Sequence, residues 1–182
     1  MARKNKDRAH TASELIEVVD SHNRFLGAMP RNEVHQQGLL HRSVLILVYN
    51  KQHKLYLQQR NRDRDAYPGC WDLSAAGHVL AGESKQEAAS RELEEELGLM
   101  PRHLHLQHEL PASRETGFEF VSLFSTGPVA EKPLPNPREV AGGLFVEPHE
   151  LDYLIQDFAH LLTPALITFW RLGCLFSGVN QL

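Results

Sequence analysis

Short apolar stretches alternate with polar, turn-forming segments along most of the chain, and this spacing is typical of β-strands. Two stretches near the start flank the turn-like residues 21–23 and predict a small β-hairpin. The most apolar stretch, SVLILVY, has the composition of a buried strand. The predicted strands are ELIEVVD (14–20), RFLGAM (24–29), SVLILVY (43–49), KLYLQQR (54–60), residues 71–76, HLHLQHEL (103–110), FEFVSLFS (118–125) and AGGLFVE (141–147).

One segment between these strands has the pattern of an amphipathic helix. Ser84 is a favourable N-cap, and Glu87 three residues later completes a capping box. Gly98 is placed to end the helix. The apolar stripe between them comprises Ala88, Ala89, Leu93 and Leu97. Further helices are predicted at 148–155 and, after Thr163-Pro164, at 165–176. Helices placed among strands in this order favour a mixed sheet flanked by helices, in the α+β class.

The length and composition fit a single globular domain. The chain has 182 residues and a formal net charge of −4, with 42% hydrophobic and 23% charged residues. Neither the charge nor any apolar run favours a nucleic-acid or membrane partner, so we expect a soluble cytoplasmic protein. Cys70 and Cys174 lack metal-site spacing and predict no disulfide framework. Residues 1–12 are polar and predict a flexible tail before one domain at 13–182.

A crowded acidic segment is the first sign of chemistry. Six glutamates lie between residues 83 and 96, and three of them are consecutive. On a helix, Glu92, Glu95 and Glu96 share one face, where like charges repel one another. A divalent cation such as Mg²⁺ or Mn²⁺ prefers oxygen ligands and would remove that repulsion. The alternative is an acidic helix face that simply points to water.

The surroundings of these glutamates favour the metal-binding interpretation. From Gly77 to Leu99 the chain carries the pattern G, five residues, E, seven residues, REUxEExGU, in which U is apolar. Every fixed position is filled, so the segment resembles the signature of the Nudix hydrolases. The resemblance implies the Nudix fold, an α/β/α sandwich around a mixed sheet. It also implies Mg²⁺-dependent hydrolysis of a diphosphate (P–O–P) linkage in a nucleoside diphosphate derivative or a similar small molecule.

The same resemblance implies roles for the residues of the motif. Glu95 and Glu96 match glutamates that bind metal, and Glu92 matches one that binds metal or acts as the general base. Arg91 matches the residue that orients them, and Glu83 matches a supporting glutamate. The implied metal ligands are thus Glu92, Glu95, Glu96, the Gly77 carbonyl and, from a later strand, Glu119.

A second resemblance extends over residues 35–125. LLHRSVLILVYNKQHKLYLQQR and YPGCWDLSAAGH resemble isopentenyl-diphosphate isomerase, a Nudix-fold enzyme that does not hydrolyse its substrate. His41 and His78 fall on two of its metal-binding histidines, and His35 lies one residue away from a third. Glu119 matches one of its glutamate ligands, whereas Gly117 stands where it has another. The resemblance therefore implies a second metal site at the histidines, with an incomplete set of ligands.

The isomerase resemblance also separates alternative functions. Arg60 and Arg64 match basic residues that hold the diphosphate in the isomerase, and the alternative for both is an exposed surface arginine. The isomerase needs a cysteine two residues before His78, and this chain has Ala76, which cannot transfer a proton. A hydrolase is therefore favoured over an isomerase, and the intact glutamates oppose a non-catalytic nucleotide-binding module. Analogy with the fold alone suggests a homodimer.

Overall fold

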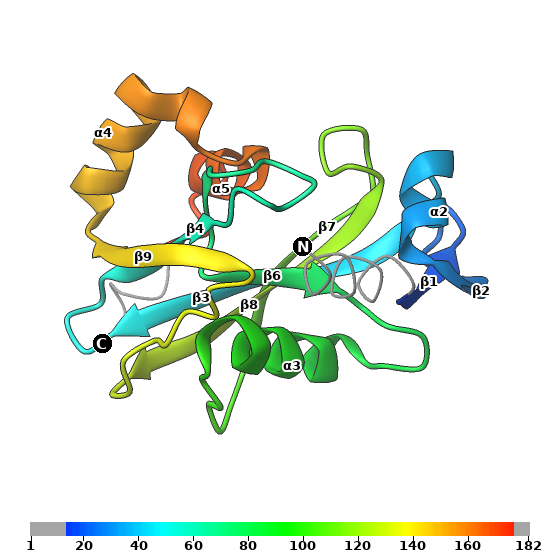
Figure 1. Cartoon of the computed structure of the whole chain (residues 1–182), viewed down its shortest axis with the longest axis horizontal. Helices are drawn as coiled ribbons and strands as arrows, with labels where there is room; N and C mark the ends of the chain where they lie inside the picture. The colour runs from blue at the N-terminus through cyan, green and yellow to red at the C-terminus, as the bar shows by residue number, and fades with distance from the viewer. Residues whose placement is uncertain (1–13, 177–182) are drawn as a thin grey trace.

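The computed structural model describes residues 14–176, which form a nine-stranded sheet with helices on both faces (Figure 1). The predicted tail at 1–12 lies outside the described residues. The strands are β1 (Leu15–Val19), β2 (Phe25–Pro30), β3 (His41–Asn50), β4 (Leu55–Arg60), β5 (Trp71–Asp72), β6 (Ala75–His78), β7 (His105–Leu110), β8 (Glu119–Val129) and β9 (Val140–Val146). The helices are α2 (Arg31–Gln37), α3 (Lys85–Leu97), α4 (Pro148–Phe158), the 3₁₀ helix η1 (Ala159–Leu161) and α5 (Pro164–Arg171).

Strand β3 is the centre of the sheet. It pairs with β8 in parallel and with β1, β4 and β6 in antiparallel orientation. Because successive side chains of a strand point to opposite faces, Val44 and Ile46 pack with α3, whereas Leu45 and Leu47 pack with α4 and α5. Helix α3 therefore covers one face and the C-terminal helices cover the other (Figure 1). This arrangement confirms the predicted α+β class and the α/β/α sandwich around a mixed sheet.

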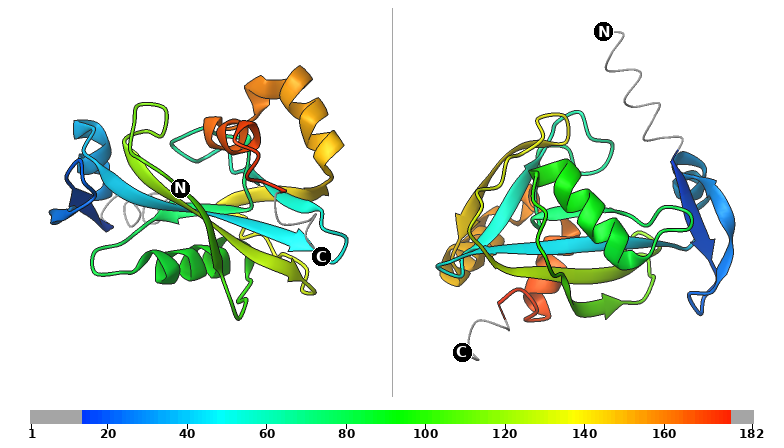
Figure 2. Two further views of the ribbon diagram at one scale, coloured as in Figure 1. Left: turned by 180° about the vertical axis from the view of Figure 1, so that it is seen from behind. Right: turned by 90° about the horizontal axis from the view of Figure 1, so that it is seen from below.

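The β1–β2 hairpin is present as predicted, but the helix that follows it was not predicted. The hairpin and α2 lie at one end of the sheet, opposite α4 (Figure 2). The sequence of α2, RNEVHQQ, buries only Val34, so it has no apolar stripe that would announce a helix. It begins after Pro30 and ends at Gly38, which has a left-handed φ of 60°. This short helix turns the chain back over the sheet toward β6.

Several predicted elements have different bounds in the structure, and two of these differences have a local explanation. The segment 71–76 is divided into β5 and β6 because Ser74, between them, bonds with its side chain to the Val48 amide and the Tyr56 carbonyl. Helix α5 ends at Arg171 rather than at residue 176, and Gly173 adopts a left-handed φ of 68° soon afterwards. Within residues 14–176, every helix is too short or too polar to cross a membrane.

Candidate active site

Helix α3 carries the acidic segment, and local hydrogen bonds define both of its ends. The Ser84 hydroxyl accepts a bond from the Glu87 amide at 3.2 Å, and the Glu87 carboxylate accepts one from the Ser84 amide at 2.8 Å. The predicted capping box is therefore confirmed. Gly98 ends the helix in a left-handed conformation, as predicted. The apolar stripe packs on the sheet, and α3 lies against β6.

The three glutamates predicted to share a helix face differ in burial. Glu96 is 1% exposed and Glu92 is 9% exposed, whereas the side chain of Glu95 is 52% exposed. Glu96 Oε2 accepts hydrogen bonds from Gln58 Nε2 at 2.9 Å and from the Ala76 amide at 3.1 Å. The structure thus buries Glu92 and Glu96 beside β6 and leaves Glu95 at the surface.

Gly77 is required at its position by space. A Cβ atom added to Gly77 would lie 1.9 Å from Cδ of Glu92, which is far inside van der Waals contact. The backbone of β6 therefore passes directly against the Glu92 carboxylate. Any side chain at this position would displace that carboxylate, which gives a physical reason for the glycine that opens the sequence motif.

Arg91 ties the acidic groups together. Its Nε donates to Glu83 Oε1 at 2.9 Å, and its Nη1 donates to Glu92 Oε1 at 2.6 Å and to Glu95 Oε2 at 3.2 Å. Its Nη2 also donates to the His78 carbonyl at 2.9 Å. The guanidinium thus connects α3 to β6 and to the loop before the helix, which is the geometry that an orienting residue requires.

Burial, together with repulsion by neighbouring carboxylates, makes the two buried glutamates resist ionisation. Burial, with a further contribution from Glu96, raises the pKa of Glu92 from 4.5 to about 8. Burial also raises the pKa of Glu96 from 4.5 to about 7, although the charge of Arg64 lowers it. A divalent cation among oxygen ligands would offset this repulsion, so the pair fits the Mg²⁺ or Mn²⁺ that the motif implies.

A second cluster forms around the next residue of β6, His78. Ligand atoms of His35, His41, His78 and Glu119 all lie within 4.8 Å of one another. His41 and Glu119 are cross-strand partners, and His78 is paired with Ser43, which lies on the same sheet face as His41. His35 enters from α2 and places its Nε2 atom 3.0 Å from that of His78. The structure thus brings together all three histidines of the predicted second site and turns Glu119 toward them.

The orientation of His41 shows that this cluster suits a metal ion. Its Nδ1 atom lies 2.8 Å from the Leu39 carbonyl oxygen, which can only accept, so Nδ1 carries the proton. Nε2 is buried, has no hydrogen-bond partner among residues 14–176, and lies 3.6 Å from Glu119 Oε1. An imidazole fixed by a carbonyl in this way is typical of a metal ligand. Three imidazoles and one carboxylate suit a transition metal such as Zn²⁺.

The protonation states in the cluster agree with metal binding. Burial is the main cause that lowers the pKa of His35 to about 4, and the neighbouring His78 and His41 contribute. Burial also lowers the pKa of His78. Both shifts favour the neutral imidazole of His35 and of His78, which is the form that binds a metal.

Gly117 leaves one side of the cluster without a side chain. It has a left-handed φ of 68°, and a Cβ added to it would lie 3.8 Å from Glu119 Oε1. A side chain at this position would therefore begin beside the cluster, as the isomerase resemblance implies for its glutamate. In this chain the cluster is open at that point.

The two arginines predicted to hold phosphate lie in different surroundings. Arg60 is buried, and it donates to Asp72 Oδ2 at 3.1 Å and to a backbone carbonyl at 3.0 Å. Much of its hydrogen-bonding capacity therefore holds the fold together. Arg64 donates to Glu139 at 2.9 Å, and its charge acts on Glu96. Arg64 consequently lies near the buried carboxylates.

Arg31 was not expected at the site. It is the first residue of α2, and its Nε donates to His78 Nδ1 at 3.2 Å. Burial, and then repulsion by Arg64, lowers its pKa, so the two cations lie close enough to interact. Arg31 is four residues before His35, which is about one helical turn. This spacing places the two side chains on one face only if the segment is helical, and the sequence did not predict that helix.

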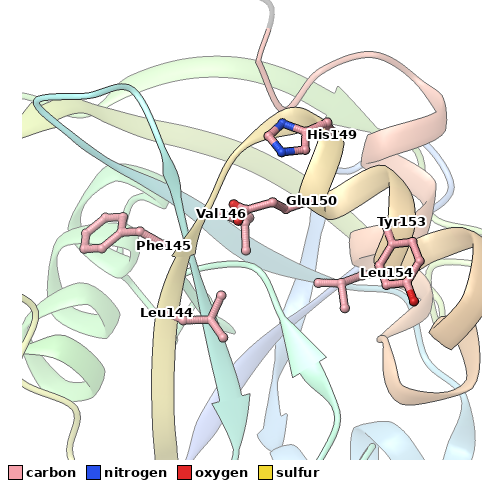
Figure 3. A pocket seen from close by; sticks show the side chains of 7 residues that line it. All are labelled: Leu144, Phe145, Val146, His149, Glu150, Tyr153 and Leu154. Carbon is pink, nitrogen blue, oxygen red and sulfur yellow. The ribbon is translucent and has the colours of Figure 1, made fainter.

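A pocket between β9 and α4 lies apart from these residues (Figure 3). Most of its side chains are apolar, and it contains no member of either cluster. It is lined by Leu144, Phe145, Val146, His149, Glu150, Tyr153 and Leu154.

Comparison of the sequence with known proteins identifies one family. The family model described as the NUDIX domain matches residues 39–166. An uncharacterized Nudix hydrolase of Pseudomonas aeruginosa is 47% identical over 92 residues, which cover 50% of this chain and 54% of that protein, so this chain spans about half the length of that relative. The isopentenyl-diphosphate Delta-isomerase of Streptomyces coelicolor is 35% identical over 144 residues, which cover 75% of this chain and 73% of that protein.

Solved structures share the fold. DR0079 from Deinococcus radiodurans superposes with a TM-score of 0.70 at 23% identity, covering 79% of this chain and 90% of that one. The family model spans more than half of the chain, and its span includes α3, β6 and most of the second cluster. This chain belongs to the Nudix domain family, as its glutamate motif predicted.

Proposed function

We propose that this chain is a Mg²⁺- or Mn²⁺-dependent hydrolase that splits the P–O–P bridge of a nucleoside diphosphate derivative or a similar small molecule. The observation that carries the proposal is the buried pair of Glu92 and Glu96 against the backbone of Gly77. A bound divalent cation supplies charge neutralisation at the phosphate oxygens and acidifies water. The name of the Pseudomonas aeruginosa relative agrees with this reaction.

Glu92 is the general base in this proposal. Its Oε1 atom accepts a hydrogen bond from Arg91, which leaves Oε2 to receive a proton. In the metal-free protein burial raises its pKa to about 8, and a base works best when its pKa lies near the operating pH. The water oxygen attacks phosphorus, its proton passes to Glu92, and the bridging P–O bond breaks. Glu95, Glu96 and the Gly77 carbonyl are the remaining proposed metal ligands.

Arginine side chains bind the substrate phosphates. Arg64 and Arg31 are the candidates because they lie next to the two clusters. Arg60 acts indirectly, since its partner Asp72 and a backbone carbonyl already use much of its guanidinium. Arginine suits this task because its planar fork of donors matches phosphate oxygens.

A panel of diphosphate compounds tests the hydrolase directly. Nucleoside di- and triphosphates, nucleotide sugars, dinucleotides and prenyl diphosphates are incubated with the protein and Mg²⁺, and released phosphate and pyrophosphate are measured. We expect Glu96→Gln to lower turnover by orders of magnitude. Glu94→Gln, a neighbouring change on the exposed side of the same helix, serves as the matched control and should keep full activity. Equal activity in both variants, or no turnover of any compound, would refute the assignment.

Isomerisation of a prenyl diphosphate is the second candidate, favoured by the histidine cluster. We assign His35, His41, His78 and Glu119 to a second metal ion, and the Streptomyces coelicolor relative is named as an isomerase. Ala76 opposes this candidate because a methyl group cannot transfer a proton. Incubation with isopentenyl diphosphate, followed by NMR of the double-bond protons, decides between the two. Migration of the double bond without release of phosphate would establish the isomerase.

A further inference from the structure

Ser43 carries a buried hydroxyl group that the fold does not use. It lies on β3 and is 4% exposed, and its Oγ atom makes no hydrogen bond of normal geometry within residues 14–176. A buried polar group without a partner destabilises the folded state. Such a group therefore needs an explanation other than stability.

The position of Ser43 points to the histidine cluster. It is two residues after His41 and opposite His78, so its side chain is on the cluster's face of the sheet. Glu119 is the cross-strand partner of His41, so Ser43, two residues further along the same face, is a diagonal neighbour of Glu119. The hydroxyl therefore lies on the face of the cluster without a hydrogen bond of normal geometry to any of its members.

We propose that Ser43 is a positioning residue for the second metal site, whose hydroxyl donates to the Glu119 carboxylate and turns one carboxylate oxygen toward the ion. This inference rests on the proposed function in one respect, the assignment of a metal ion to the cluster. A carboxylate ligand needs such a partner when its other oxygen has no donor to fix it. The orientation of Glu119 is especially important in this chain, because Gly117 leaves the cluster with only one carboxylate.

The test uses Co²⁺ as the probe. A four-coordinate site with imidazole ligands gives Co²⁺ a strong visible absorption, which the oxygen ligands of α3 would not give. The apparent dissociation constant is measured for the full chain by titration against a chelator. We expect Ser43→Ala to weaken Co²⁺ binding by about 10- to 100-fold, the range found for residues that orient metal ligands.

Two controls separate positioning from folding. Ser122→Ala removes a similarly buried hydroxyl on β8, one that donates to Glu109, and should leave the Co²⁺ affinity unchanged. In metal-free protein, Ser43→Ala should melt at the same or a higher temperature than the wild type, because it removes a buried hydroxyl without a partner. In a Glu119→Gln background, Ser43→Ala should have no further effect on affinity, because the group that it orients is already changed.

The outcomes distinguish this inference from the assignment of the cluster. If wild-type protein shows no imidazole-type Co²⁺ spectrum, or keeps it in His41→Ala, then the metal site itself is wrong. If wild-type protein binds Co²⁺ and Ser43→Ala binds it within about twofold of the wild-type affinity, the role of Ser43 alone is overturned. An additive effect of Ser43→Ala and Glu119→Gln would also overturn it.

Discussion

Replacing Glu96 by Gln should make the metal-free protein more stable at high pH while it abolishes hydrolysis. Glu96 is almost completely buried, and its pKa is raised from 4.5 to about 7, chiefly by burial. Between these pH values the folded state holds a proton that the unfolded state has released. The free energy of unfolding therefore falls as pH rises through this range. Glutamine has the same shape, can still accept from Gln58 and Ala76 with its carbonyl oxygen, and does not ionise.

The size of the effect follows from the pKa values. One pKa unit corresponds to about 1.4 kcal/mol, so the rise from 4.5 to about 7 removes about 3 kcal/mol from the free energy of unfolding at pH 8. That is a large part of the total stability of a typical domain, about 5–15 kcal/mol. The variant retains the pH dependence due to Glu92. That dependence should shrink as well, because the Glu96 charge contributes to raising the pKa of Glu92.

Urea denaturation in EDTA at pH 5 and pH 8 measures the effect. The wild type should lose about 3 kcal/mol or more between the two values, and Glu96→Gln should lose much less. Glu94→Gln, on the exposed side of the helix, should follow the wild type. Added Mg²⁺ should raise the free energy of unfolding of the wild type at pH 8, since an ion that binds only the folded state stabilises that state. If the free energy of unfolding in EDTA fell equally with pH in the wild type and in Glu96→Gln, the claim that burial raises the pKa of Glu96 would be wrong.

Three further changes have outcomes that the structure predicts. Gly77→Ala should lower turnover about 100-fold, because the added Cβ atom occupies the place of the Glu92 carboxylate. Turnover is measured by phosphate release, and turnover equal to that of the wild type would contradict the close approach of Gly77 to Glu92. Gln58→Leu should raise the Mg²⁺ concentration needed for half-maximal activity, because Glu96 loses a donor; an unchanged Mg²⁺ dependence would show that this bond does not position the carboxylate. Ser84→Ala should lower the free energy of unfolding by about 1 kcal/mol, because α3 loses its N-cap. Urea denaturation with saturating Mg²⁺ measures the change, and an unchanged free energy would mean that the capping box does not stabilise the fold.

Helix α3 could be predicted almost residue by residue because its determinants are local. The capping box joins residues three apart, the stripe follows the helical period, and Gly98 adopts the left-handed conformation that ends the helix. The glutamate motif is equally local, so the family could be inferred from one segment. Helix α2 was missed for the opposite reason, since it buries only Val34 and is held in place by the hairpin and the sheet.

The sequence by itself determined the family, the class of fold, and which helix carries the carboxylates. Only the tertiary structure decided which of those carboxylates are buried, because the burial of Glu92 and Glu96 depends on how α3 packs against β6 and on the contact of Glu96 with Gln58 of β4. The same holds for the histidine cluster, whose members come from α2, β3, β6 and β8. In the sequence, His35 lies one residue away from the position of the third metal-binding histidine of the isomerase. In the structure, the seven-residue helix α2 brings His35 into contact with His78. Contacts between residues far apart in the chain depend on packing, and no local pattern records them.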